Sequence, residues 1–315
     1  MPEMDYRHRL DKVMTEKEAV ATFLHDGDSF TLGGALASRR CFSVGREMIR
    51  QKKRNLTFVD TAAGVETTMM VAGGCISKLR LGYFLMRTAG LKIDDTILRA
   101  MRDGVPNPLE VEDFTQYQLA MGFMAASMNI PYMVTKSGLG ADYPEYNKTL
   151  KLANDPFENK PIIMVPAISP DVGLFCVQRA DRRGNAQVFG DIWADDVKSR
   201  ACKHVIVVTE ELVSTEVIQK YPANTLIPSY CVDAVVEVPF NCHPGSCYGC
   251  YGGYFADYAS FIQMVLAFGT YEGALRWLDE WVYSTEDQAE YCDKVGWRNL
   301  MRLVKMERSI NRLPE

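Results

Sequence analysis

The feature that most constrains the fold is a regular alternation of helical and extended segments in the first half of the chain. It begins with a capping box, in which Thr15 is followed three residues later by Glu18, a pattern typical of a helix N-terminus. Apolar residues recur at helical spacing over 19–24, and an Asp-Gly-Asp turn at 26–28 ends them. The stretch SFTLGG at 29–34 then predicts a strand that ends in paired glycines.

The same alternation continues to residue 135. Its periodicity predicts further helices over 41–51, 65–72 and 116–128, and further strands over 56–62, 78–85 and 132–135. Apolar strands that alternate with helices are typical of a mainly parallel sheet whose two faces are covered by helices. We therefore expect an α/β fold.

The second half of the chain is richer in strands and ends in helices. Short β-branched runs bounded by Pro, Gly or Asp predict strands over 162–168, 171–180, 204–212 and 231–240. Aromatic and aliphatic residues at helical spacing predict helices that begin near Asp257, Glu272, Glu286 and Gly296. We expect one α/β domain over 1–256 and a helical C-terminal extension over 257–315, packed on that domain or on a partner subunit.

Composition and charge argue against several classes of function. The net charge is −5, and acidic and basic residues are mixed along the chain, so we expect neither nucleic acid nor an anionic membrane as a partner. The N-terminal stretch MPEMDYRHRLDKV is charged where a signal peptide would be apolar, and no apolar run is long enough to span a bilayer. We therefore expect a cytoplasmic protein whose nine cysteines are reduced thiols.

Glycines at strand ends are the first candidates for a binding site, because ligands of open parallel sheets bind beyond the carboxyl ends of the strands. Three such places stand out: Gly33-Gly34, Gly73-Gly74 and the SGLG segment at 137–140. They complete neither a dinucleotide fingerprint nor a P-loop. Exposed backbone N–H groups at such glycines suit an anionic oxygen, and the alternative interpretation is a tight turn.

The sequence offers little support for a nucleophilic catalytic site formed by this chain alone. There is no G-x-S-x-G elbow, and a triad has only four histidines to draw on: His8, His25, His204 and His243. Of these, His243 lies in a loop rich in glycine and polar residues, so it is the histidine that we expect at a functional site.

The stretch CHPGSCYGCY at 242–251 suggests a metal or redox site at first sight. It holds one C-x-x-C pair, Cys247 and Cys250, whereas structural zinc sites ordinarily use two ligand pairs. Cys242 and His243 are adjacent and cannot easily face one ion, and Cys231 lies eleven residues earlier on a predicted strand. The glycines make a poor helix start, which argues against a thioredoxin-type pair. We expect no metal here.

Three stretches together resemble the alpha (A) subunit of glutaconate CoA-transferase, a family I CoA-transferase. They are DGDSFTLGG followed by SRR, VVTEELVS, and CVDAVVEVPFNCHPGSCYGCY, and they occur in the family's order at compatible spacings. The resemblance covers about Thr15 to Tyr254 and continues more weakly into the helical tail. It implies an α/β fold, a CoA thioester as substrate, no permanently bound cofactor, and a beta-type partner subunit in a heterotetramer or larger assembly.

The resemblance also implies a shared active site. In that family the nucleophile is a glutamate of the beta-type subunit, so we expect no nucleophile on this chain. The positions of this chain that match the family's substrate-binding and oxyanion residues, together with two polar groups expected to line the pocket, are Gly33, Gly34, Arg39, Arg40, Gln116, Ser137, Gly138 and His243. Ala35 replaces a phenylalanine that is common after the paired glycines, and Cys242 and Cys250 fall where the family usually has other residues.

Three functions besides CoA transfer between carboxylates, dicarboxylates included, stay open at this point. A related branch hydrolyses a ring C–C bond in CoA thioesters with a glutamate near the position of Gln116. An amide cannot act as a general base, although a shift of one turn would bring Glu112 or Asp113 to that place. The second function is that of a metal- or redox-responsive protein centred on the cysteine loop, and the third is that of a non-catalytic scaffold for a partner.

Overall fold

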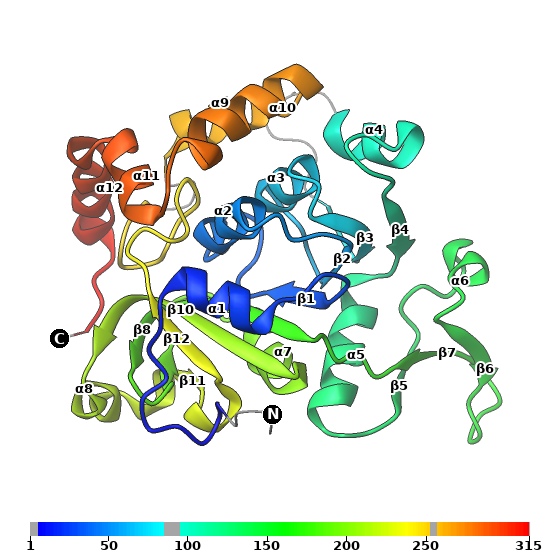
Figure 1. The fold of residues 1–315 in the computed structure, drawn as a ribbon. Coiled ribbons are helices and arrows are strands. Elements are labelled where there is room, and N and C mark those ends of the chain that lie inside the picture. The colour runs from blue at the N-terminus through cyan, green and yellow to red at the C-terminus, as the bar shows by residue number, and fades with distance from the viewer. Residues whose placement is uncertain (1–5, 85–94, 253–256, 315) are drawn as a thin grey trace, which may run out of the picture.

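A nine-stranded sheet forms the centre of the molecule (Figure 1). The computed structural model describes residues 6–84, 95–252 and 257–314. Seven strands of the sheet are mutually parallel in the order β4-β3-β2-β1-β8-β10-β12. Their bounds are β1 (Ser29–Leu32), β2 (Leu56–Asp60), β3 (Ile76–Leu81), β4 (Glu110–Asp113), β8 (Val172–Asp181), β10 (His204–Val213) and β12 (Ala234–Glu237). The remaining two strands are β9 (Ala186–Gln187), which pairs antiparallel with β8, and β11 (Thr225–Ile227), which pairs antiparallel with β9.

Both faces of the sheet are buried, as the apolar strands of the sequence predict. Along β8, Leu174 and Cys176 pack into one core cluster, while the alternate residues Phe175 and Val177 pack into another. Helices α1 (Glu16–Phe23), α2 (Phe42–Arg50) and α3 (Val65–Ala72) contribute to the first cluster. Helices α5 (Gln116–Ser127) and α7 (Asp195–Ala201) contact each other and share a third cluster. The expected α/β fold is confirmed.

Two capping boxes fix helix starts. Thr15 Oγ1 accepts from the backbone N–H of Glu18, whose carboxylate accepts from the backbone N–H of Thr15. Thr115 and Gln118 repeat this arrangement at the start of α5. Each box satisfies amides that a helix leaves without partners at its N-terminus. The predicted helix starts near residues 15 and 116 are therefore both confirmed.

A second, three-stranded sheet stands apart from the first (Figure 1). It consists of β5 (Tyr132–Thr135), β7 (Pro161–Pro166) and β6 (Lys151–Asn154), paired antiparallel in that order. The sequence predicts the strands at 132–135 and near 162–168 but does not separate them from the main sheet, because hydrophobic periodicity does not specify which strands pair. The short helix α6 (Tyr143–Tyr146) lies in the connection between β5 and β6.

The C-terminal residues form helices that share the core of the α/β domain. Their bounds are α9 (Tyr258–Ala267), α10 (Tyr271–Leu278), a π-helical turn at Asp279–Tyr283, α11 (Gln288–Val295) and α12 (Trp297–Ile310). Trp277, Leu278 and Leu300 are buried in the same cluster as α2 and α3. In Figure 1, α9 and α10 extend across the α2–α3 side of the molecule. The aromatic residues of this tail therefore pack largely within the chain.

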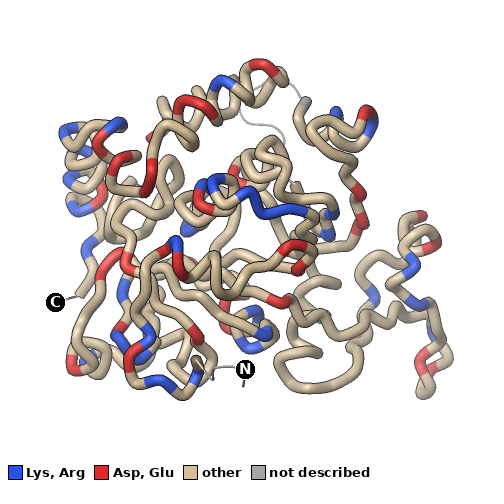
Figure 2. The backbone as a smooth tube through the Cα atoms, viewed as in Figure 1, with Lys and Arg blue, Asp and Glu red and all other residues tan. Residues whose placement is uncertain are grey.

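The remaining elements are peripheral connections. In the part of the chain that the structure describes, they are α4 (Asp95–Asp103), α8 (Thr215–Lys220) and two 3-10 turns, at Pro222–Asn224 and Ser229–Cys231. The second turn corrects the sequence prediction of a strand from Cys231, because the strand begins at Ala234. Among the described residues, no helix has the length and apolar character needed to cross a bilayer. Lys and Arg are interspersed with Asp and Glu over most elements of the fold (Figure 2).

Candidate active site at the carboxyl edge of the parallel sheet

Four neighbouring strands, β1 to β4, end at one edge of the sheet, and the predicted site residues follow two of them. Gly33 and Gly34 follow β1, and Gln116 begins α5 shortly after β4. Neighbouring strands lie about 4.8 Å apart, so β1 and β4 are separated by roughly 14 Å along this edge. The predicted residues therefore lie near the two ends of this edge.

The paired glycines lead into a two-residue hairpin. Ala35 and Ser38 exchange two backbone hydrogen bonds of 3.1 and 2.9 Å, which leaves Leu36 and Ala37 at the tip. Gly34 has a φ of +64°, and an added Cβ would lie 2.2 Å from the carbonyl oxygen of Ser38. Only glycine fits this position without moving the backbone.

The amides of both glycines are already used within the chain. The N–H of Gly33 donates to the carbonyl of Leu174 at 2.8 Å, and the N–H of Gly34 donates to Asp195 Oδ1 at 2.9 Å. Neither amide of the hairpin tip, at Leu36 or Ala37, has an acceptor within the described part of the chain. The N–H groups available to an anionic oxygen are thus those of the tip.

Arg39 lies beneath the hairpin and contacts protein groups. Its side chain is fully buried, and Nη1 lies 2.7 Å from Asp195 Oδ2, the carboxylate that also receives the amide of Gly34. Nη2 donates to the carbonyl of Asp191 at 2.6 Å. Burial by itself lowers the pKa of Arg39, but the adjoining Asp195 carboxylate outweighs it and raises that pKa. Arg39 therefore acts as a brace for the hairpin.

Arg40 is buried in an ion network of its own. Nη1 lies 3.0 Å from Asp60, at the end of β2, and Nη2 lies 2.8 Å from Glu66 in α3. Lys198 of α7 reaches the same Asp60 at 2.5 Å from the other face of the sheet. Nη1 of Arg40 also donates to the carbonyls of Gly33 and Gly34. The sequence matches Arg40 to a substrate-binding position; in the structure its donors hold the glycine carbonyls in place.

His243 belongs to a loop that docks on the hairpin, but its side chain faces away from it. Ser246 connects the loop to the hairpin by two backbone hydrogen bonds. Its N–H donates to the carbonyl of Ala37 at 2.8 Å, and its carbonyl accepts from the N–H of Arg39 at 2.8 Å. The fully buried imidazole lies 2.8 Å from the hydroxyl of Tyr291 and 3.3 Å from Asp257. Burial lowers the pKa of His243. The ring therefore connects the loop to the C-terminal helices.

Gln116, Ser137 and Gly138 come together at the β4 end of the edge. The exposed Gln116 starts α5, and its backbone packs against Gly82 at the end of β3 so closely that an added Cβ on Gly82 would lie 2.4 Å from the Gln116 nitrogen. The buried Gln118 ties the segments together, because its Nε2 donates to the carbonyl of Ser137 at 2.8 Å. The predicted SGLG loop and the predicted Gln116 are thus neighbours.

The two carboxylates near Gln116 differ in their surroundings. The Glu112 carboxylate accepts a hydrogen bond from Arg80 Nε at 2.7 Å and lies 3.4 Å from Lys78 Nζ. It also accepts a hydrogen bond from the hydroxyl of Thr149. Burial alone raises the pKa of Glu112, but the Thr149 hydrogen bond and Arg80 outweigh burial and lower the pKa. A carboxylate stabilised in this way is a weak base. Asp113 is exposed at the end of β4.

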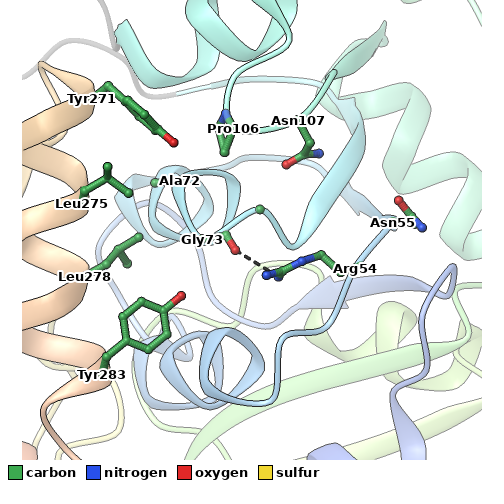
Figure 3. A pocket seen from close by; sticks show the side chains of 11 residues that line it. Arg54, Asn55, Ala72, Gly73, Pro106, Asn107, Tyr271, Leu275, Leu278 and Tyr283 are labelled. Atoms are coloured by element: carbon green, nitrogen blue, oxygen red, sulfur yellow. Dashed lines mark hydrogen bonds between the residues drawn. The ribbon is translucent and has the colours of Figure 1, made fainter.

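The Gly73-Gly74 pair lies at the opposite edge of the sheet. It follows α3 and precedes β3, so it stands at the amino end of a strand, which corrects its place among the strand-end glycines of the sequence prediction. It borders a pocket of about 280 Å³ between the starts of β2 to β4 and helix α10. Figure 3 shows Arg54 pointing at the Gly73 carbonyl, with which it makes a hydrogen bond of 3.1 Å. This pocket is separate from the carboxyl edge.

Sequence reasoning misses the acidic partners that hold the hairpin. Asp60 and Asp195 are buried carboxylates that lie 135 residues apart in the chain, and each binds one of the two arginines. The signal at Asp60 is local, because it is an acidic residue at the end of an otherwise apolar strand. Asp195 follows a loop and offers no such signal.

Comparisons with known proteins agree with this architecture. Residues 13–238 match the family described as Coenzyme A transferase. The A subunit of glutaconate CoA-transferase from Acidaminococcus fermentans is 30% identical over 93% of this chain and 95% of its own length. The A subunit of 3-oxoadipate CoA-transferase from Pseudomonas knackmussii is 28% identical over 90% of this chain and 98% of its own. An uncharacterized Archaeoglobus fulgidus protein is 34% identical over 96% of this chain, which spans 66% of that relative.

A solved structure extends the agreement to the coordinates. The crystal structure of glutaconate coenzyme A-transferase from A. fermentans matches with a TM-score of 0.85 and 28% identity. The match covers 93% of this chain and 95% of the chain in the crystal. The likeness in fold therefore extends over nearly the whole chain.

Proposed function

Because the chain belongs to the coenzyme A transferase family, we propose that it is the A-type subunit of a heteromeric CoA-transferase that moves CoA between an acyl-CoA and a carboxylate. The observation that carries the proposal is the likeness, over nine tenths of the chain or more, to two relatives named as CoA-transferase A subunits. Both names refer to dicarboxylates, which supports a dicarboxylate as the acid.

The proposed reaction divides between two chains. A glutamate of the partner attacks the thioester carbonyl, CoA thiolate leaves, and the resulting anhydride is attacked by that thiolate to give a glutamyl-CoA thioester and the free acid. A second carboxylate then takes CoA by the same steps in reverse. Every step passes through a tetrahedral oxyanion, so the site needs positioned N–H donors and exclusion of water.

The residues of this chain would supply donors and supports. We assign oxyanion donation to the backbone N–H groups of Leu36 and Ala37, because the amides of Gly33 and Gly34 are used internally. Arg39 and Arg40 support the hairpin from beneath.

At the other end of the edge, Gln116 would contact the acyl or acid moiety, beside Ser137 and Gly138 of the SGLG loop. His243 would fix the loop that docks on the hairpin. The division into an α/β unit over 1–256 and a helical extension over 257–315 belongs to the same proposal, as does a cytoplasmic location.

The surroundings of the two carboxylates favour transfer over hydrolysis of a carbon–carbon bond. A hydrolase of this fold would need a carboxylate base at the position of Gln116. Glu112 is engaged by Arg80 and Thr149, and its pKa is lowered, which is the wrong direction for a base. Asp113 therefore becomes the discriminating residue.

Kinetics on the chain purified with its partner test the proposal. We expect CoA exchange between an acyl-CoA and a panel of mono- and dicarboxylates, and inactivation by borohydride only after acyl-CoA is added, since borohydride reduces the glutamyl thioester. Gln116→Ala should lower kcat/KM by about 10-fold, the value of one hydrogen bond in the transition state. Asp113→Ala should leave exchange near that of the exposed control Glu158→Ala.

The opposite pattern would refute CoA transfer. That pattern is a lack of exchange across the whole acid panel together with ring-opening activity on a cyclic acyl-CoA that Asp113→Ala abolishes.

A further inference from the structure

The cysteine loop brings two thiols and a carboxylate to one buried point. Cys242 and Cys247 lie on the loop after β12, and Glu210 lies on β10. One ligand atom from each, the two Sγ atoms and a carboxylate oxygen, lie within 4.8 Å of one another. Both cysteines are fully buried. Sequence inspection misses this set because Glu210 is 32 residues from the nearer cysteine and belongs to another element.

The loop is shaped so that the thiols converge. Cys247 and Tyr251 exchange two backbone hydrogen bonds, of 3.1 and 3.0 Å, which close a tight turn. His243 turns the opposite way, toward Tyr291 and Asp257, so the adjacent Cys242 is free to face Glu210. Cys242 and His243 thus face different groups, and the third member of the cluster is the carboxylate of Glu210.

The carboxylate of Glu210 is held in place by neutral donors. Oε1 accepts from the hydroxyl of Tyr251 at 2.6 Å and from Asn241 Nδ2 at 2.8 Å, and Oε2 accepts from the backbone N–H of Phe240 at 2.7 Å. No Lys or Arg of the described chain pairs with it. Hydrogen bonds of this kind orient the ligands of metal sites.

A pocket borders the carboxylate of the cluster. It has a volume of about 650 Å³, and its lining includes Glu210, Cys250 and Tyr251 together with Arg179, Arg308 and Arg312. It gives an ion a route to the carboxylate and leaves room for a water molecule.

We propose that Glu210, Cys242 and Cys247 bind one thiophilic divalent cation of the zinc class, with a water from the pocket as the fourth ligand. Soft thiolates with one carboxylate are a donor set that Zn²⁺ accepts in tetrahedral geometry. Binding converts two thiols to thiolates and releases two protons to solvent. This reverses the sequence expectation that the loop holds no metal.

The role of the ion is structural. It joins β10 to the loop whose Ser246 pairs with Ala37 of the glycine hairpin and with Arg39 directly after it. The cation would therefore help to fix the hairpin through this loop, in addition to Arg40 and its carboxylates. Its binding does not depend on which acyl-CoA the enzyme uses, or on whether it is a transferase.

Cobalt binding to the full chain with its partner, purified anaerobically and stripped of metal, tests the site. We expect about one Co²⁺ per chain, with a sulfur-to-cobalt charge-transfer band and the visible bands of tetrahedral cobalt. Cys242→Ser and Cys247→Ser should each weaken Co²⁺ binding by more than about 10-fold and diminish the charge-transfer band. Cys231→Ser, which removes a buried thiol outside the cluster, should change neither.

Glu210→Gln provides a second variant that keeps the side-chain volume, and it should weaken Co²⁺ binding while the charge-transfer band survives at saturation. Near-UV circular dichroism of each variant establishes that it is folded. Absence of the charge-transfer band in the folded wild-type protein would overturn the proposal, as would equal affinities in the wild type and both cluster cysteine variants.

Discussion

At the β1 end of the carboxyl edge buried charges hold the backbone, whereas at the β4 end neutral hydrogen bonds do so. Arg40 supports the carbonyls of Gly33 and Gly34, and its own charge is balanced by buried carboxylates. Gln118 joins the start of α5 to the SGLG loop through one donated and two accepted hydrogen bonds. Each group fixes a loop beside the end of a strand, but a buried ion network does so after β1 and neutral hydrogen bonds do so after β4.

The difference indicates which end is preformed. A buried ion network loses its compensation when any member is removed, so it tolerates few alternative arrangements. The hairpin is therefore suited to hold oxyanion donors in fixed positions. At the other end Gln118 is buried too, but it joins neutral groups by single hydrogen bonds, and the neighbouring Gln116 is exposed, so this end carries no buried charge that fixes one arrangement.

Arg40→Met has the largest expected effect. It removes the cation between Asp60 and Glu66 and leaves Glu66 buried with its principal partner missing. We expect the free energy of unfolding to fall by about 3–5 kcal/mol, the usual loss when one partner of a buried ion pair is removed. Denaturant unfolding of the variant measures this loss.

The control for Arg40→Met is Arg182→Met, which breaks the exposed pair with Asp11. That change should leave the free energy of unfolding close to that of wild type, because solvent screens an exposed ion pair. If both variants lose the same stability, the buried network is not what fixes the hairpin.

Gln118→Met tests the other end. The change keeps the side-chain volume but removes the partners of the Ser137 carbonyl, the Thr115 amide and the Tyr143 hydroxyl. We expect a loss of about 1–3 kcal/mol in the free energy of unfolding, the cost of unpaired buried polar groups. Gln116→Met, two residues earlier on the exposed face, should stay within about 0.5 kcal/mol of wild type. If Gln118→Met lost more free energy of unfolding than Arg40→Met, the end held by neutral hydrogen bonds would be the more firmly fixed of the two.

The sequence predicts local structure at this edge better than it predicts contacts. The helix predicted over 65–72 is α3, and the one predicted over 116–128 ends one residue earlier, at Ser127. These predictions succeed because capping and periodicity are local. The strands of the small sheet and the orientation of His243 depend on partners distant in the chain, as does the Asp195 contact with Gly34, 161 residues away. No spacing within a segment encodes those contacts.

His243→Gln addresses the loop that docks on the hairpin, and it has the smallest expected effect. Burial lowers the pKa of His243 below the ordinary value of 6.5, so the unfolded chain binds a proton there more readily than the folded one. Stability contributed by the neutral ring is therefore present above pH 6.5 and is lost as the pH falls through the lowered pKa. Between pH 7.5 and 5.5, wild type should lose more free energy of unfolding than His243→Gln. Tyr291→Phe, which removes the hydroxyl at 2.8 Å but keeps the ring buried, should retain the wild-type pH dependence; an equally steep dependence in His243→Gln would mean that other groups produce it.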